Sequence, residues 1–203
     1  MSTVTIRPRT EADIPSCIEI LHSVYAISGY PVDGPLKAQE NLKTLGRAWV
    51  AVAVTEDEGT EKVLGHVALN PGNASRQSHV RIWEEQQQTQ KQKQKPSKGG
   101  GGEKTEGEKE VGVGVGVLGW LFVHPDARGR GLATRLVNHA MKEKEMSRTT
   151  ERAVLLALVK DVDAIRLYEK LGWTRYGTTV YKWRDPGTGV QREMEGICFV
   201  SPV

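Results

Sequence analysis

The 203-residue chain has few of the features that would assign it to a class of protein at once. It holds two cysteines, Cys17 and Cys198, so it lacks a disulfide framework, and we expect both to be free thiols of an intracellular protein. Residues 1–7 contain no apolar signal run, and no segment approaches the ~20 consecutive apolar residues of a membrane span. These absences exclude a disulfide-stapled secreted domain and a membrane protein. We expect a cytoplasmic location, with the nucleus left open.

A large excess of one charge and the common phosphate and metal motifs are lacking as well. The formal net charge of +3 and the pI near 8.8 are too small an excess for nucleic acid to be the main partner. The Walker pattern needs Gly-Lys followed by Ser or Thr, which is absent, and the dinucleotide fingerprint needs glycine or alanine where Thr134 stands. No His/Cys cluster has metal-ligand spacing, so no metal site is predicted.

What is present is an alternation of strand-like and helix-like segments, with 38% hydrophobic residues to form a core. Apolar runs predict strands at residues 4–7, 48–54, 63–69, 111–123, 153–159, 175–183 and 191–200. Helical spacing of apolar residues predicts helices at residues 14–28, 36–45, 132–141 and 162–171. This order predicts one α/β domain over residues 1–203, with a sheet of mixed strand direction.

Two segments depart from regular patterns. Valine and glycine alternate through residues 111–117, and the alternation breaks after that, which predicts a β-bulge or change of register near Leu118. Residues 84–110 contain six Gln, six Lys, six Glu and no apolar residue. Such a segment cannot offset the entropy lost on ordering, so we expect it to be a disordered low-complexity insertion within the domain.

The most informative segment is residues 121–133, which read LFVHPDARGRGLA. An apolar strand stops at Pro125, turns through Arg-Gly-Arg-Gly and enters an amphipathic helix. The start of such a helix presents free backbone N–H groups, and its dipole favours an anion there. Glycines remove side chains that would hold a phosphate away, and Arg128 and Arg130 add positive charge on either side. The segment therefore predicts a pyrophosphate site.

This segment resembles the acyl-CoA loop of the GNAT N-acetyltransferase superfamily, which reads Arg or Gln, two residues, Gly, any residue, and Gly or Ala. Residues 128–133, RGRGLA, match it at every position. Residues 161–173, DVDAIRLYEKLGW, are similar to a second family segment from Ala164 onward, but Asp161 stands where asparagine is usual. The order of elements is also similar, over nearly the whole chain outside residues 84–110. The resemblance implies a GNAT-like fold, with a mixed, mostly antiparallel sheet of about seven strands flanked by four helices.

The resemblance also implies an activity, an acetyl-CoA-dependent N-acetyltransferase in which a primary amine of a small molecule or peptide attacks the thioester directly. Tyr168 would be the acid that protonates the departing sulfur, since a phenol stays protonated at neutral pH. At Asp161 an ionised carboxylate only accepts hydrogen bonds, where asparagine would also donate, and Asp161 is also a candidate helix cap. The residues that the resemblance places against the co-substrate, through side chain or backbone, are Leu121, Phe122, Val123, Arg128, Gly129, Arg130, Gly131, Leu132, Ala133 and Asp161.

The residues alone leave alternatives open. Tyr168 falls on an apolar stripe with i, i+3, i+4, i+7 spacing, which is typical of a core tyrosine whose hydroxyl is tied to a partner. The domain could bind acyl-CoA without transferring it, since a fold can persist without its chemistry. The lysines of residues 84–110 could instead bind nucleic acid or an acidic partner, although the composition favours a solvated loop.

The general base is not assigned. The strand expected at residues 111–123 carries no carboxylate, and His66 and His124 are candidates by residue type alone. Deprotonation of the amine through water is equally compatible with the sequence.

Overall fold

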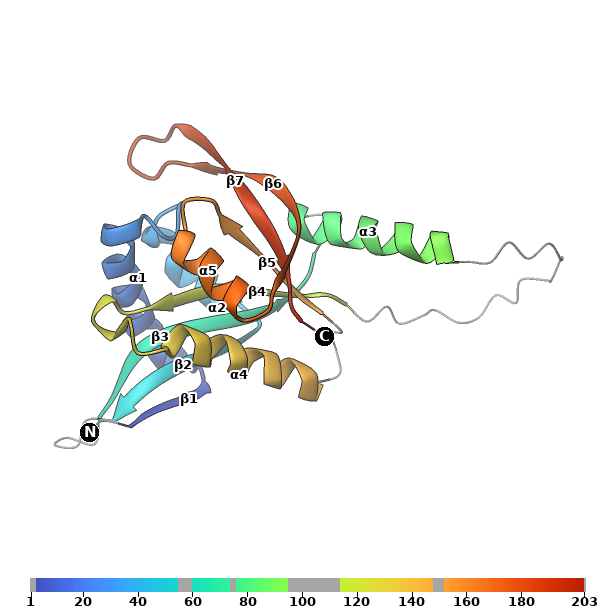
Figure 1. The fold of residues 1–203 in the computed structure, drawn as a ribbon. Helices are drawn as coiled ribbons and strands as arrows, with labels where there is room; N and C mark the ends of the chain where they lie inside the picture. Colours follow the sequence, from blue (N-terminus) through green and yellow to red (C-terminus); the bar gives the residue numbers. More distant parts are fainter. Residues whose placement is uncertain (1–2, 55–59, 74–75, 95–113, 148–151, 203) are drawn as a thin grey trace.

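The computed structural model describes residues 3–54, 60–73, 76–94, 114–147 and 152–202. Within them, seven strands form one sheet and five α-helices pack against it (Figure 1). The strands are β1 (Val4–Pro8), β2 (Arg47–Val54), β3 (Glu61–Pro71), β4 (Gly116–Val123), β5 (Ala153–Leu158), β6 (Thr174–Arg184) and β7 (Gln191–Val200). The helices are α1 (Ile14–Ser28), α2 (Ala38–Thr44), α3 (Ser78–Gln94), α4 (Leu132–Ser147) and α5 (Val162–Lys170).

The predicted α/β class and mixed sheet are confirmed. The strand order is β1-β2-β3-β4-β5-β7-β6, and every neighbouring pair is antiparallel except β4 and β5. The strand expected at residues 111–123 begins at Gly116, and residues 111–113 lie outside the described residues. The structure has one helix more than the four that the sequence predicts, and this helix is α3.

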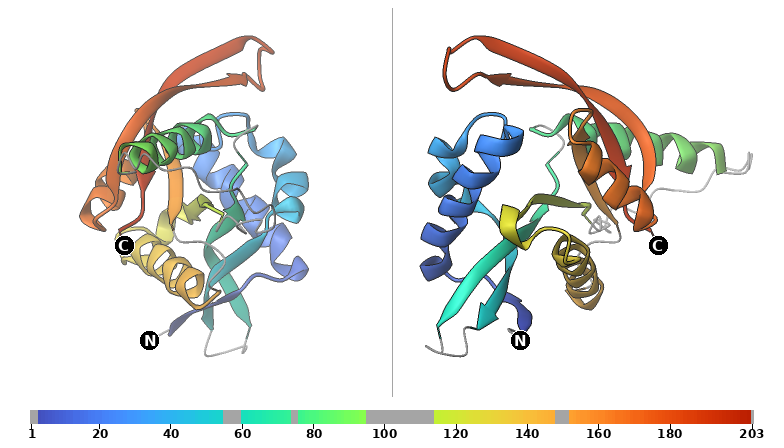
Figure 2. Two further views of the ribbon diagram at one scale, coloured as in Figure 1. Left: turned by 90° about the vertical axis from the view of Figure 1, so that its right-hand side faces the viewer. Right: turned by 60° about the vertical axis from the view of Figure 1, so that its left-hand side comes forward.

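Burial follows the alternation of side chains along the strands. Val50 and Val52 of β2 join the cluster formed by α1 and α2, whereas Trp49 and Ala51 join the cluster that contains the apolar stripe of α4. This part of β2 is therefore buried on both faces, as its continuous apolar run predicts. Figure 2 shows α1 and α2 on one side of the strands and α4 on the other.

Strands β4 and β5 pair only at their first residues. Their parallel ladder joins Gly116 to Ala153 and Val117 to Val154, and the two strands then run apart (Figure 1). Beyond Val117, the edge of β4 that faces β5 has no strand partner within the described residues. The sheet is therefore split at its centre, and backbone groups of β4 on that edge are available to a ligand.

Helix α3 corrects the expectation for the start of the low-complexity segment. Residues 84–94 were expected to be disordered, but they continue a helix that begins at Ser78, so the expectation is wrong for them. Gln, Glu and Lys are good helix formers, and the first turns are anchored by buried Val80 and by Trp83, whose ring lies 5.3 Å from that of Tyr176. Residues 95–110 lie outside the described residues.

Candidate active site

The split between β4 and β5 opens into a cavity of about 760 Å³. Five elements contribute to its walls: the end of α1, the strands β4 and β5, the beginning of α4, and α5. Its lining includes nearly all the residues that the sequence predicts at the site, namely Leu121, Phe122, Val123, Arg128, Gly129, Gly131, Leu132, Ala133, Asp161 and Tyr168. Segments more than thirty residues apart in the sequence therefore meet around one space.

The loop between β4 and α4 owes its shape to two glycines. Gly129 has φ +75° and Gly131 has φ +72°, a backbone region that residues with a side chain rarely adopt. A Cβ atom added at either position would meet no atom within 4 Å. The glycines are thus required by the turn itself and not by crowding, and the space beside both of them is open.

The first turn of α4 presents N–H groups beside this loop that have no hydrogen-bond partner in the part of the chain that the structure describes. The N–H of Arg135 donates to the carbonyl of Gly131 at 3.1 Å, so the N–H groups of Leu132, Ala133 and Thr134 precede the first carbonyl that a helix can offer them. All three residues line the cavity. These donors and the positive end of the helix dipole make an anion site, and Thr134 adds to it a residue that the sequence analysis did not include.

The two arginines of the loop do not lie alike. Both side chains are exposed, but Arg128 lines the cavity and Arg130 does not. The sequence could not separate them, because both flank Gly129 and neither carries a pattern that fixes its direction. A contact of Arg130 with the co-substrate stays a prediction.

Strand β4 contains a bulge beside the cavity. Phe122 pairs with His66 and Gly119 with Ala68, so two residues of β4, Trp120 and Leu121, oppose one residue of β3. Trp120 has φ +53°, a left-handed conformation found at no other non-glycine residue in the described part of the chain. The sequence predicts a bulge near Leu118, and the structure places it two residues further along, where the backbone reaches the cavity wall.

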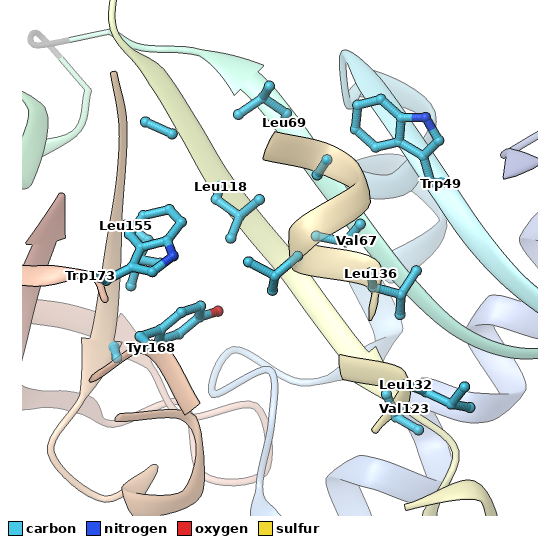
Figure 3. Close-up of a cluster of buried hydrophobic side chains, with 14 of the residues drawn as sticks. Trp49, Val67, Leu69, Leu118, Val123, Leu132, Leu136, Leu155, Tyr168 and Trp173 are labelled. Atoms are coloured by element: carbon cyan, nitrogen blue, oxygen red, sulfur yellow. The ribbon is translucent and has the colours of Figure 1, made fainter. Parts of the chain in front are cut away.

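Tyr168 is held rigidly with its hydroxyl toward the cavity. The residue is 6% exposed, and its ring packs against the rings of Trp173 and Phe199 at 5.5 and 6.0 Å. In Figure 3 the hydroxyl points across the space between β5 and β4. Its oxygen has no hydrogen-bond partner within the residues that the structure describes. Burial, and then the charge of Asp161, raise the pKa of Tyr168 far above neutral, so the phenol keeps its proton.

Lys160 and Asp161 form an ion pair at the start of α5. The Nζ of Lys160 lies 2.8 Å from Oδ1 of Asp161 and also donates to the carbonyl of Ser28 at 2.9 Å. Asp161 occupies the N-cap position, but its side chain makes no capping hydrogen bond. Lys160 therefore ties the β5–α5 junction to the end of α1. Lys160 is not among the residues predicted from the sequence, because no local pattern indicates a contact across 132 positions.

Neither histidine considered as a base lines the cavity. His66 is fully buried on the α1 face of the sheet, with Nδ1 2.8 Å from the carbonyl oxygen of Trp120. His124 uses its Nδ1 to accept a hydrogen bond from the N–H of Asp126 at 3.2 Å, which caps the short turn before the glycine loop. Both rings are thus occupied in supporting the backbone on either side of the site.

A second cavity, of about 440 Å³, lies between the α1–α2 connection and the β6–β7 hairpin. Its walls include Asp33, Leu36, Tyr181 and Trp183. Tyr30 lines the first cavity, and its pKa is raised mainly by burial and further by Tyr168, Asp161, Asp33 and Tyr181. Tyr168 and Asp161 line the first cavity, whereas Asp33 and Tyr181 line the second.

The hairpin closes over this end of the molecule. Figure 2 shows β6 and β7 arching toward α1 and α2. A Cβ atom added at Gly34 would lie 3.0 Å from two ring atoms of Pro186, so the α1–α2 connection and the hairpin turn are in contact. Exposed apolar side chains surround this end, each lining a cavity or adjacent in sequence to a lining residue: Ile27, Leu36, Val162, Val180, Tyr181 and Val190.

The described residues contain neither a metal-binding cluster nor a membrane-spanning helix. No group of three or more His, Cys, Asp or Glu side chains there could hold a metal ion. No helix in those ranges is long and apolar enough to cross a membrane.

Comparison with known proteins places these features in a family. The model of the acetyltransferase (GNAT) domain matches residues 46–175. Arabidopsis thaliana NAA60, solved with a bisubstrate analogue, has a TM-score of 0.64 and 19% identity, with 99% of each chain covered. The ribosomal-protein-S18-alanine N-acetyltransferase of Escherichia coli has a TM-score of 0.59 and 15% identity, covering 99% of this chain and 94% of that one.

The NatC complex bound to a Gag peptide and CoA is similar at a TM-score of 0.59 and 16% identity, with 98% of each chain covered. At these identities the structural likeness shows a shared fold. No curated protein sequence matches the chain.

Proposed function

The chain belongs to the GNAT acetyltransferase family, and from this premise we propose that it moves an acetyl group from acetyl-CoA to a primary amine by direct attack. Acetyl-CoA would supply an acetyl group activated as a thioester. The observation that carries the proposal is the hydroxyl of Tyr168, which faces the cavity without a partner within the described residues while the glycine loop lines the same cavity. A core tyrosine of purely structural role would have its hydroxyl tied to a neighbour.

The residues around the cavity suit acetyl-CoA. The open space beside Gly129 and Gly131 and the unused N–H groups at the start of α4 suit a diphosphate, and Arg128 adds a positive charge. The unpaired edge of β4 at residues 121–123 suits the amides of an extended pantetheine arm, which could bond to it as an added strand would. Asp161 lies on the opposite wall, already paired with Lys160.

Tyr168 would act as the acid of the reaction. Its raised pKa keeps a proton on Oη at every pH at which the amine is reactive, and that proton can pass to the sulfur that leaves as the thioester breaks. Bulge residues of β4 would hold the thioester through their backbone. The amine nitrogen forms the new C–N bond as the C–S bond breaks, and CoA leaves as the free thiol with the proton of Tyr168. The proton that the amine loses passes to water, from which Tyr168 is protonated again, and no bond to the enzyme forms.

We further propose that the acceptor is the α-amine of a peptide. The second cavity, where we place the acceptor, is closed on one side by the contact between Gly34 and Pro186. Such a cavity favours the amino terminus of a peptide over an internal residue. The apolar rim suits the first side chains of a peptide. Asp33, half-buried and without an ion pair in the described part of the chain, could attract the positive amino terminus. The similar NatC structure contains a peptide, which agrees with this assignment.

The experiment is thiol release from acetyl-CoA with pairs of peptides that differ only in their amines. One peptide has a free amino terminus and no lysine, and the other has a blocked terminus and one internal lysine. Activity with only the first supports a peptide α-amine, and activity with only the second refutes it. If the protein binds acetyl-CoA but releases no thiol with either peptide or with a panel of small amines, it is a binding module.

The role of Tyr168 is tested by Tyr168→Phe. We expect kcat to fall by about a hundredfold or more, because general acids contribute on that scale, while the affinity for acetyl-CoA is retained. Tyr176→Phe is the matched control: its hydroxyl donates to the carbonyl of His79 at 2.7 Å and the residue does not line the cavity, so its kcat should be that of the wild type. Equal kcat values for the two variants would refute the acid role.

A further inference from the structure

The feature that the proposed chemistry does not use is the buried ring of His66. It lies at the centre of β3, opposite Val50 of β2 and Phe122 of β4, and none of its surface is exposed. The ring stacks on Phe122 with centroids 5.0 Å apart and an interplanar angle of 12°. Burying a polar ring at such a position costs free energy unless its nitrogen atoms form hydrogen bonds.

One nitrogen has a use that fixes its protonation. Nδ1 lies 2.8 Å from the carbonyl oxygen of Trp120, and a carbonyl can only accept, so Nδ1 carries the hydrogen. Burial lowers the pKa of His66 to about 4, so the ring is neutral at physiological pH and Nε2 is a bare acceptor. Nε2 is itself buried without a partner in the described part of the chain. A histidine at this position therefore makes one hydrogen bond, from Nδ1 to Trp120, and leaves Nε2 unsatisfied.

That hydrogen bond supports the bulge at the cavity wall. The ladder between β3 and β4 is interrupted at Trp120 and Leu121, which removes regular partners from the bulged backbone. The left-handed conformation of Trp120, φ +53°, is intrinsically unfavourable for a residue with a side chain. A donor aimed at the carbonyl of that residue stabilises both departures from the regular strand.

We propose that His66 is a positioning residue for acetyl transfer, which holds the β4 bulge in the shape that presents the backbone of Trp120 and Leu121 to the acyl thioester. The inference rests on the proposed function, because it concerns the same site. His66 touches neither substrate and acts only through the carbonyl of Trp120. Substitution of His66 should therefore change kcat and kcat/KM for acetyl-CoA, and these changes should not correlate with the stability of the fold.

Two substitutions separate the hydrogen bond from the packing. His66→Phe keeps an aromatic ring against Phe122 and removes both the donor and the unsatisfied Nε2, so the fold should stay stable while kcat/KM for acetyl-CoA falls by about tenfold to a hundredfold. His66→Asn places an amide N–H near the position of Nδ1 but leaves a void, so it should be less stable and yet more active than His66→Phe.

His79→Phe is the matched control, because His79 is also a buried histidine whose Nε2 has no partner among the described residues, and it does not line the cavity. Its kcat/KM should equal that of the wild type. The inference is overturned if His66→Phe has wild-type kcat/KM, or if activity in the three variants follows their melting temperatures. Absence of turnover by the wild type, with acetyl-CoA bound, would instead refute the proposed function and with it the premise of this test.

Discussion

Replacing Gly131 by alanine tests the phosphate loop without altering any charge. The residue has φ +72°, and a Cβ atom added there would meet nothing within 4 Å. The cost to folding is therefore conformational and not steric, and it should be about 1 kcal/mol, the penalty of holding an alanine in the left-handed region. The new methyl group would stand in the open space beside the loop, which a bound phosphate needs.

A matched control exists at the end of α5. Gly172 has φ +78° and also nothing within 4 Å of an added Cβ, and the turn is closed by bonds from its N–H to Glu169 and from the N–H of Trp173 to Tyr168, each 3.0 Å long. Gly172→Ala carries the same conformational penalty, but Gly172 does not line the cavity. Both variants should melt about 2–4 °C below the wild type for that penalty in a chain of this length.

Titration calorimetry with acetyl-CoA then distinguishes the two positions. Loss of one hydrogen bond to a charged oxygen is worth about 1.5–3 kcal/mol, so Gly131→Ala should bind acetyl-CoA roughly ten to a hundred times more weakly. Gly172→Ala should bind as the wild type does. The reasoning is refuted if both variants bind alike, or if Gly131→Ala loses far more stability than Gly172→Ala, since the open space beside it leaves no other source of cost.

Two further predictions concern the stability of the fold at acidic pH. Two hydrogen bonds of 2.8 Å from Arg7 are the main cause that lowers the pKa of Asp13 from 3.8 to about 2. The resulting stabilisation, about 2 kcal/mol, is complete above pH 4 and lost as the pH falls toward 2, so urea unfolding of Asp13→Asn should differ from the wild type at pH 7 and not at pH 2. Burial lowers the pKa of His79 from 6.5 to about 4, so the unfolded chain takes up a proton first and stability falls as the pH drops between these values, by about 3 kcal/mol from this residue. His79→Phe should flatten that decline, and an unchanged slope would contradict a neutral buried ring.

The parts of the site that could be predicted are those that depend on local sequence. The left-handed turn at Gly129 and Gly131 is specified by glycine itself, and the helix that follows shows its apolar stripe within three turns. Tyr168 could be placed because its helix carries a family segment, and its burial follows from the same stripe. These features need no knowledge of distant contacts.

The features that escaped prediction depend on contacts between distant segments. The bulge at Trp120 is fixed by His66, 54 residues earlier, so the change in alternation indicates its existence but not its position. The bridge from Lys160 to Ser28 spans 132 residues and has no local pattern. Helix α3 was missed for a related reason: its Gln-rich half has no apolar face, and its order starts from Val80 and Trp83, which lie before the segment that composition marks as disordered.

Three sets of polar groups without a partner among the described residues lie around one cavity, although buried nitrogens such as Nε2 of His66 and of His79 lie elsewhere. A folded chain pairs nearly all its buried backbone and side-chain polar atoms, so groups left without partners indicate where the chain gives up stability. Three such sets meet at one cavity: the edge of β4 beyond Val117, the first N–H groups of α4, and the hydroxyl of Tyr168. A single ligand that extends from a charged phosphate through amide groups to a reactive thioester would satisfy first the N–H groups of α4, then the edge of β4, and last the hydroxyl of Tyr168. The bulge that His66 supports lies within this free edge of β4, and its residues line the same cavity as the glycine loop and Tyr168.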